Sequence, residues 1–274
     1  MVLAMRRTVL VGLALLAACG DAAAPAITAP AITAPATTAG ATTAPVTTAV
    51  SGTIRVFAAS SLTGAFTALG EAFRTANPGA TVTFSFAASS ALVAQLGEGA
   101  PGDVFASADE ATMAKLVDAK GAAGTPVVFA TNRLQIAVGP GNPKGVTALA
   151  DLARPGLAVV LCAPQVPCGR YAAEALTTAG VAVTPKSLEE NVRAVLTKVQ
   201  LGEADAGIVY ETDVRATDGK VTGVAIPADR NVVARYPIVV TAGARAPDAA
   251  RAFVAFTTSS AGQAVLARFG FGAP

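Results

Sequence analysis

Histidine and tryptophan are both absent from the 274 residues, and aromatic residues make up only 5% of the chain. Without histidine the chain cannot build a Ser-His-Asp or Cys-His catalytic arrangement, nor an imidazole metal site. Two phosphate-binding signatures are also missing: the Walker loop and a GxGxxG that opens a helix after a strand. The sequence therefore predicts that the chain is not an enzyme and uses no cofactor.

Charged residues are also scarce, at 14% of the chain, with 20 Lys and Arg against 18 Asp and Glu. Two of the basic residues, Arg6 and Arg7, lie in a predicted N-terminal targeting segment, so its removal would leave equal numbers of both signs. A neutral chain lacks the basic surface that nucleic-acid binding requires. We therefore expect no nucleic-acid partner.

Residues 1–19 have the pattern of a lipoprotein signal peptide. The two arginines precede an uncharged run, 8–18, that is too short to span a bilayer. The run ends in LAAC, which resembles the lipobox of bacterial lipoproteins, whose cysteine is diacylated and becomes the new N-terminus. We expect Cys19 to carry the lipid and to hold the protein on the extracytoplasmic face of a membrane. An ordinary signal peptide, cut at a small-residue site, is the alternative.

Residues 20–52 are a low-complexity segment of Ala, Pro and Thr with repeated APAIT-type units. It has no charged residue after Asp21 and no aromatic residue. Such a segment cannot bury enough surface to fold, and its prolines keep it extended. We interpret it as a disordered tether between the anchor and the folded part.

From residue 53 onwards, strand patterns alternate with helical patterns. The strand patterns cover 53–58, 81–86, 103–107, 127–130, 134–138, 157–162, 206–210, 221–226 and 236–241. The helical patterns cover 62–75, 90–98, 110–120, 170–179, 188–201 and two stretches after Pro247. This alternation predicts an α/β fold of mixed, mostly parallel sheets with flanking helices.

The predicted elements divide into two lobes. Residues 53–131 together with 236–274 form an outer lobe, and residues 132–235 form an inserted lobe that is entered and left by two crossovers. Ligands of open α/β sheets bind beyond the carboxyl ends of the strands, often between lobes. We therefore expect the binding site in the cleft between the lobes.

Two Ser-Ser pairs stand where a predicted strand meets a predicted helix, at Ser60 and Ser61 and again at Ser89 and Ser90. The simpler interpretation places Ser60 or Ser61 at a helix N-cap, where the hydroxyl satisfies a free backbone N–H. The same junction can also bind an anion, because a helix start offers free N–H groups, the positive end of the dipole and a hydroxyl donor. Its repetition at a second equivalent junction favours the anion site.

The cysteines Cys162 and Cys168 flank a short loop that precedes a helical pattern. In an exported protein such a pair indicates a disulfide, which for so small a ring contributes about 2–3 kcal/mol. Free thiols and a two-cysteine metal site are the alternatives. The helix that follows is a third candidate anion-binding helix start.

Several other residues could carry chemistry. Asp103 and Asp109 bracket a short strand and could form a carboxylate pair, although Asp109 is more simply a helix cap. The side chain of Val192 belongs to an apolar helical stripe. Tyr210 ends a predicted strand, where its hydroxyl could point into a cleft or its ring could fill the core edge.

Five stretches, read in order, carry a family resemblance: VFAASSLTGAF, FSFAASSALVAQLGEGAPGDVFASAD, VPCGRYAAEAL, NVRAVLTKVQLGEADAGIVYETD and RYPIVV. Together they resemble the periplasmic molybdate-binding proteins of ABC transporters, over essentially all of 53–274. The resemblance implies a two-lobe, type II periplasmic-binding-protein fold that closes over one tetrahedral oxyanion, molybdate or tungstate. It also implies delivery of the anion to a membrane permease. We expect a monomer.

The family's ligand contacts fall on the hydroxyls of Ser61, Ser89 and Tyr210 and on the backbone N–H groups of Cys168 and Val192. At Cys168 the chain departs from the family pattern, in which alanine is common, but a backbone contact does not depend on the side chain. Neutral donors of this kind can replace the hydrogen bonds that a dianion loses on desolvation. No carboxylate acceptor is implied, which disfavours protonated phosphate and leaves sulfate open.

Two alternatives remain at this point. One is a binding protein for sulfate or another small anion on the same fold. The other is a secreted serine hydrolase that uses Ser61 with a lysine base, although no lysine lies near either serine turn in the sequence.

Overall fold

The computed structural model describes residues 50–274, so the predicted signal peptide, Cys19 and most of the tether lie outside the described residues. The strands are β1 Ser51–Ala59, β2 Gly79–Ala87, β3 Val104–Ala106, β4 Val127–Val138, β5 Val159–Cys162, β6 Ser187–Glu189, β7 Ala206–Tyr210, β8 Thr222–Ala225 and β9 Val233–Val240. The α-helices are α1 Thr63–Ala76, α2 Ser89–Gly97, α3 Glu110–Asp118, α4 Pro167–Thr178, α5 Val192–Gln200, α6 Glu211–Arg215, α7 Pro247–Thr258 and α8 Ser260–Arg268. Two short 3-10 helices are η1 Ser60–Leu62 and η2 Leu149–Ala153.

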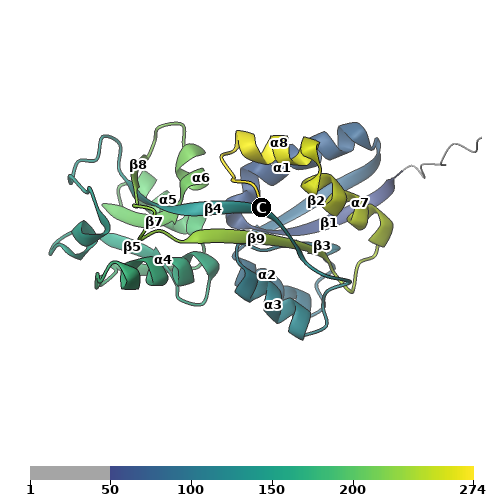
Figure 1. Cartoon of the computed structure of the whole chain (residues 1–274), viewed down its shortest axis with the longest axis horizontal. Coiled ribbons are helices and arrows are strands. Elements are labelled where there is room, and N and C mark those ends of the chain that lie inside the picture. Colours follow the sequence, from purple (N-terminus) through teal and green to yellow (C-terminus); the bar gives the residue numbers. More distant parts are fainter. Residues whose placement is uncertain (1–49) are drawn as a thin grey trace, which may run out of the picture. The chain divides into compact units, whose positions relative to one another are not determined.

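The strands form one path of hydrogen-bonded neighbours in the order β2-β1-β3-β9-β4-β7-β5-β6, with β8 on β4. Parallel pairs lie in two groups, β2-β1-β3 and β6-β5-β7. The antiparallel pairs are those made by β4 and β9, the two long strands that run between the groups in Figure 1. The predicted fold class, a mixed α/β sheet with flanking helices, is confirmed.

Strand β4 corrects the prediction of two separate strands at 127–130 and 134–138. It is continuous, with a register shift between Val128 and Ala130. Its first half pairs with β9, and its second half, from Leu134, pairs with β7 and β8. The chain thus passes from one parallel group to the other within a single strand. The division into lobes at 131/132 and 235/236 stays a prediction, and we keep the names outer lobe and inserted lobe for those ranges.

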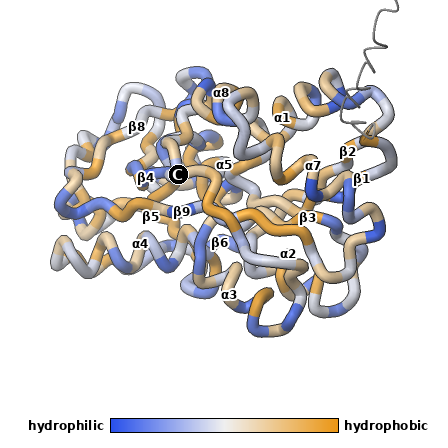
Figure 2. The backbone as a smooth tube through the Cα atoms, turned by 45° about the vertical axis from the view of Figure 1, so that its right-hand side comes forward, coloured by the Kyte–Doolittle hydropathy of each residue, from blue (hydrophilic) through white to orange (hydrophobic). Residues whose placement is uncertain are grey.

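Helices cover both faces of the β2-β1-β3 group. Helices α1, α7 and α8 pack together on one face, and α2 and α3 pack on the other (Figure 1). Alternate residues of the strands therefore enter different cores, as Val56 and Phe57 do. Strands buried on both faces have continuous apolar sequences, and hydrophobic colouring follows the central strands in Figure 2.

The helix predicted at 188–201 is wrong at its start. Residues Ser187–Glu189 form β6, which pairs with β5, and the helix begins only at Val192. Leu188 matched the spacing of the apolar stripe, but its side chain is 54% exposed. Asn191 marks the true boundary, because its side chain caps the helix by accepting a hydrogen bond from the N–H of Ala194.

Candidate functional site

The five predicted ligand residues, Ser61, Ser89, Cys168, Val192 and Tyr210, all line one pocket. Every residue of the lining lies at or just beyond the carboxyl end of one of six parallel strands: β1, β2 and β3 on the outer-lobe side, and β5, β6 and β7 on the inserted-lobe side. This is the position at which open α/β sheets bind ligands. We call the two sides the outer wall and the inner wall.

The outer wall offers two hydroxyl groups, each of which already has a hydrogen-bond partner in the protein. The Ser61 hydroxyl lies 3.0 Å from the hydroxyl of Tyr236, and the Ser89 hydroxyl accepts from the backbone N–H of Ala108 at 3.0 Å. Neither Ser60 nor Ser61 caps a helix: both lie inside η1, and neither η1 nor α1 has a side-chain cap. The capping interpretation is therefore wrong at this junction, because the chain turns through a 3-10 segment before α1 begins.

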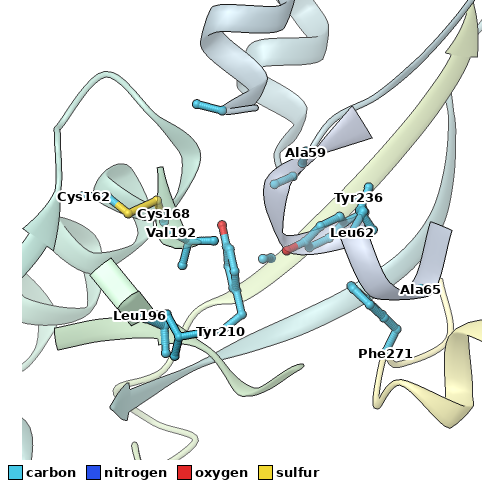
Figure 3. Close-up of a cluster of buried hydrophobic side chains, with 14 of the residues drawn as sticks. Ala59, Leu62, Ala65, Cys162, Cys168, Val192, Leu196, Tyr210, Tyr236 and Phe271 are labelled. Atoms are coloured by element: carbon cyan, nitrogen blue, oxygen red, sulfur yellow. A yellow bond between two sulfur atoms is a disulfide. The ribbon is translucent and has the colours of Figure 1, made fainter. Parts of the chain in front are cut away.

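The inner wall is made mainly of backbone. Val192 is the first residue of α5 and Cys168 is the second residue of α4, positions whose N–H groups have no acceptor within the helix. Cys168 is bonded to Cys162 at the end of β5, with the two Cα atoms 5.8 Å apart. The disulfide ties the start of α4 to the strand behind it, as Figure 3 shows.

The hydroxyl of Tyr210 is the third polar group of the inner wall, after the N–H groups of Cys168 and Val192. Its side chain is 1% exposed, and its hydroxyl is the buried side-chain polar atom without a hydrogen-bond partner in the described part of the chain. In Figure 3 the hydroxyl end of the ring lies beside Val192, which lines the same pocket. Burial raises the pKa of Tyr210 well above its ordinary value, so the hydroxyl keeps its proton. Because this hydroxyl lines the pocket and has no partner within the protein, its proton is free to bind a ligand there.

Behind Tyr210 lies the carboxyl of Asp213, which accepts a hydrogen bond from the Tyr210 N–H at 3.1 Å. Burial raises the pKa of Asp213 to about 7, although that N–H and the charge of Arg193 act to lower it. At neutral pH this carboxyl is therefore only partly ionised. Negative charge near the inner wall is limited accordingly.

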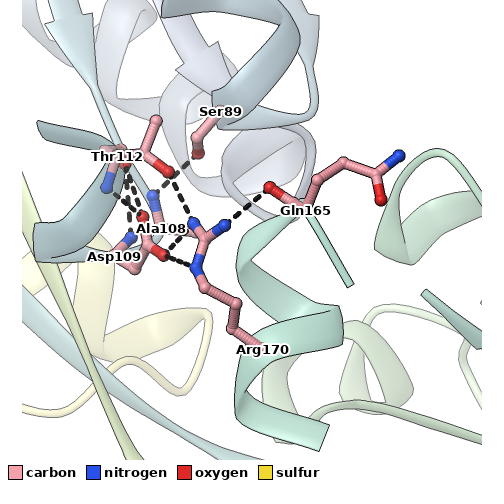
Figure 4. Close-up of polar contacts among 7 residues, drawn as sticks. Ser89, Ala108, Asp109, Thr112, Gln165 and Arg170 are labelled. Atoms are coloured by element: carbon pink, nitrogen blue, oxygen red, sulfur yellow. Dashed lines mark hydrogen bonds and ion pairs between the residues drawn. The ribbon is translucent and has the colours of Figure 1, made fainter. Parts of the chain in front are cut away.

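Arginines connect the two sides around the pocket. Arg170 of α4 binds the carboxylate of Asp109 in the outer lobe through Nε at 2.9 Å and also through Nη2, which donates to Thr112 as well (Figure 4). Arg193 of α5 donates to the carbonyl of Ser60 at 3.2 Å. We call the first of these, Arg170 with Asp109 and Thr112, the α4 clasp.

The two aspartates that could have formed a carboxylate pair have separate structural roles. Asp109 caps α3, as predicted, by accepting from the N–H of Thr112 at 2.9 Å. Asp103 accepts from the backbone N–H groups of Arg55, Arg245 and Ala246. Neither carboxylate lines the pocket.

The pocket is small and uncharged. The cavity volume is only about 10 Å³, whereas sites for organic ligands are usually several hundred Å³. The lining residues, all within 50–274, include no Asp, Glu, Lys or Arg. Within residues 50–274, no group of three or more His, Cys, Asp or Glu side chains could hold a metal ion. None of the helices described there is long and apolar enough to cross a membrane.

Three polar residues next to the site were missed from the sequence. Asn191 has the helix-cap signature of an Asn directly before an apolar helical stripe, and this signal was available. Tyr236 was part of a quoted motif, but nothing in the sequence indicates that it reaches Ser61 from 175 residues away. No sequence signal pairs Arg170 with Asp109.

Comparison with known proteins places this chain in a family. The molybdate-binding protein ModA of Mycobacterium tuberculosis is 47% identical over 222 residues, which cover 81% of this chain and 85% of that protein. Among solved structures, the periplasmic molybdate-binding protein of Azotobacter vinelandii has a TM-score of 0.70 at 23% identity, covering 81% of this chain and 99% of that one. The sulfate-binding protein SubI from Mycobacterium tuberculosis has a TM-score of 0.74 at 22% identity, covering 80% and 86%. These two structures support the fold alone, and they confirm the predicted periplasmic-binding-protein architecture. A family model described as bacterial extracellular solute-binding protein matches residues 54–272, and the chain therefore belongs to that family.

Proposed function

We propose that the protein captures molybdate, and tungstate equally, outside the cytoplasm and delivers it to the permease of an ABC transporter. The observation that carries the proposal is that hydroxyl and N–H donors from both walls line one small pocket without a charged lining residue. The 47% identity to a protein named for molybdate binding supports this choice of anion.

The physical basis of binding is the replacement of water by fixed neutral donors. A dianion that enters the pocket loses its hydration and needs hydrogen bonds to all its oxygens. Ser61, Ser89 and Tyr210 can donate hydroxyl protons, and Cys168 and Val192 can donate N–H groups at helix starts, where the dipole favours negative charge. The proposal needs no cofactor.

The chain binds a solute and does not transform it. Its membership in a family of solute-binding proteins confirms the prediction that it is not an enzyme. The hydrolase alternative also needs a lysine beside Ser61, and none is present among the residues that line this pocket.

We also propose that the protein is lipid-anchored and acts as a monomer beside its permease; the predicted tether and lipobox support the anchor. Cys19 would carry the lipid, and residues 20–52 would let the folded part reach the transporter. Cys19→Ala should release the protein from membranes into the soluble fraction. A mutant that still sediments with membranes as the parent does contradicts the anchor, and leaves the anion site untouched.

Calorimetric titration of residues 51–274 with molybdate, tungstate and sulfate tests the ligand. Molybdate and tungstate should bind with similar affinity, because their shape and charge are nearly the same. Sulfate should bind far more weakly, since its shorter bonds would leave several buried donors unpaired at roughly 1–3 kcal/mol each. Equal affinity for sulfate and molybdate would refute the size argument and favour a general binding protein for small anions.

A further inference from the structure

A chain of buried hydrogen bonds runs from the outer wall into the crossing strands. The Ser61 hydroxyl lies 3.0 Å from the Tyr236 hydroxyl on β9, and the Asn132 amide on β4 lies 3.5 Å further on. The same amide nitrogen donates to the Thr212 hydroxyl at 2.8 Å. All four side chains are less than 9% exposed, so solvent does not compete for these contacts.

The direction of this chain follows from what each group can do. The Asn132 carbonyl oxygen accepts from the N–H of Arg133 at 2.9 Å, which turns the amide nitrogen toward Thr212 and Tyr236. An amide nitrogen only donates, so the Tyr236 oxygen must accept from it. The proton of Tyr236 is then available for the Ser61 oxygen.

Tyr236 is a reliable donor at any pH at which the protein works. Its side chain is 0% exposed, and burial raises the pKa of the phenol far above neutral. Of the two described groups that contact the Tyr236 hydroxyl, Ser61 Oγ and Asn132 Nδ2, only the serine oxygen can accept a proton, so Ser61 accepts from Tyr236. The Ser61 proton itself has no acceptor among the described side chains. The pocket that Ser61 lines is the place left for that proton.

We infer that Tyr236 is a positioning residue for anion binding: it orients the Ser61 hydroxyl so that its proton points into the pocket. This inference rests on the proposed anion-binding function. Ser89 is oriented in the same way by a backbone N–H, that of Ala108, which no substitution except proline at 108 can remove. The orientation of the Ser61 hydroxyl depends instead on the phenol of Tyr236, so a substitution at Tyr236 can change it.

Tyr236→Phe keeps the ring and removes only the donor. The Ser61 hydroxyl can then rotate and can also accept, so the dissociation constant for molybdate should rise roughly three- to tenfold, the equivalent of one ordinary hydrogen bond. Tyr171→Phe is the matched control, because Tyr171 lies outside the pocket lining, and it should leave the constant unchanged. Thermal unfolding of each variant shows whether it is folded.

A double-mutant cycle separates orientation from general packing. If Tyr236 acts through Ser61, Tyr236→Phe should have less than about a twofold effect when Ser61 is already alanine. A second readout is the choice of anion: sulfate should weaken along with molybdate, whereas hydrogenphosphate should not, because the freed Ser61 hydroxyl can accept its proton. Asn132→Ala keeps Tyr236 but removes the amide that fixes its direction, and should give a smaller loss that also disappears in Ser61→Ala.

The titrations use the purified full chain, and their outcomes distinguish the two ideas. A parent protein that binds none of molybdate, tungstate and sulfate overturns the proposed function and this inference with it. A parent that binds molybdate, with Tyr236→Phe and Asn132→Ala both unchanged, overturns the inference alone. The inference is also overturned if Tyr236→Phe weakens molybdate binding by the same factor in the Ser61→Ala protein as in the parent.

Discussion

The two walls of the pocket reach the same chemistry by different means. The outer wall offers Ser61 and Ser89, whose hydroxyls are oriented by neighbouring donors. The inner wall offers the first turns of α4 and α5, where Cys168 and Val192 present backbone N–H groups, and one phenol, Tyr210. Both walls are neutral, and both stand at the carboxyl ends of parallel strands.

The difference determines how each wall responds to mutation. A side-chain donor is lost when its residue changes, whereas a backbone donor survives every substitution except proline. Cys168 illustrates this. Its side chain forms the disulfide with Cys162, and only its backbone N–H is proposed to contact the anion. The inner wall should therefore tolerate changes of sequence that the outer wall does not.

The largest effect on binding should come from Val192→Pro. Proline is well accommodated at the first position of a helix, and the preceding residue, Asn191, has the extended backbone that proline requires, with φ −157° and ψ 168°. The substitution removes one N–H that faces a dianion, at a cost of about 1.5–3 kcal/mol, or roughly ten- to 150-fold in affinity.

Val192→Ala is the control for this substitution. It removes more of the buried side chain, which is 2% exposed, but it keeps the N–H. Calorimetry with molybdate should show nearly parental affinity for Val192→Ala and strong loss for Val192→Pro. Equal affinities in the two variants would show that the inner wall does not bind through this N–H.

Ser89→Ala should come next, with a loss of about 1–3 kcal/mol in binding free energy. It should also lower the free energy of unfolding, because the buried N–H of Ala108 loses its acceptor. Ser61→Ala should weaken binding comparably and should also lower the free energy of unfolding, because the buried Tyr236 hydroxyl loses the acceptor of its proton. Ser90→Ala, at the neighbouring position, is the control. Unchanged binding in both Ser61→Ala and Ser89→Ala would show that the hydroxyls of the outer wall do not bind the anion.

Much of this arrangement could be predicted from the sequence, because strand-to-helix junctions are local. The turns at Ser61 and Ser89 were recognised from apolar runs that change period, and the family resemblance supplied Cys168, Val192 and Tyr210. The start of α5 was placed too early because Leu188 happens to match the helical spacing, although its pairing with β5 is a tertiary contact. The partners Tyr236 and Arg170 come from distant segments, and no local pattern brings them to the site.

Tyr210→Phe should give a smaller loss of affinity, about tenfold, for the one hydroxyl of the inner wall. Unlike Ser89→Ala, this substitution should not destabilise the protein. The Tyr210 hydroxyl is buried without a partner, so its removal should leave the melting temperature of the ligand-free protein unchanged or higher. A lower melting temperature together with unchanged affinity would show that the Tyr210 hydroxyl stabilises the fold and does not bind the anion.

The smallest effects should come from the α4 clasp, which joins the walls without lining the pocket. Asp109→Asn keeps an N-cap for α3 and removes a negative charge near the bound anion, but it weakens the contact with Arg170. These consequences oppose each other, so molybdate affinity should change less than about threefold.

Arg170→Gln breaks the same contact and leaves Asp109, whose side chain is 4% exposed, with an unpaired charge. Here both consequences weaken anion binding, and the loss should exceed that of Asp109→Asn and grow smaller as salt is added. Titrations of both variants at low and high ionic strength measure this asymmetry. Equal losses in the two variants, independent of salt, would mean that the clasp acts only by holding the walls together and that its charges do not reach the anion.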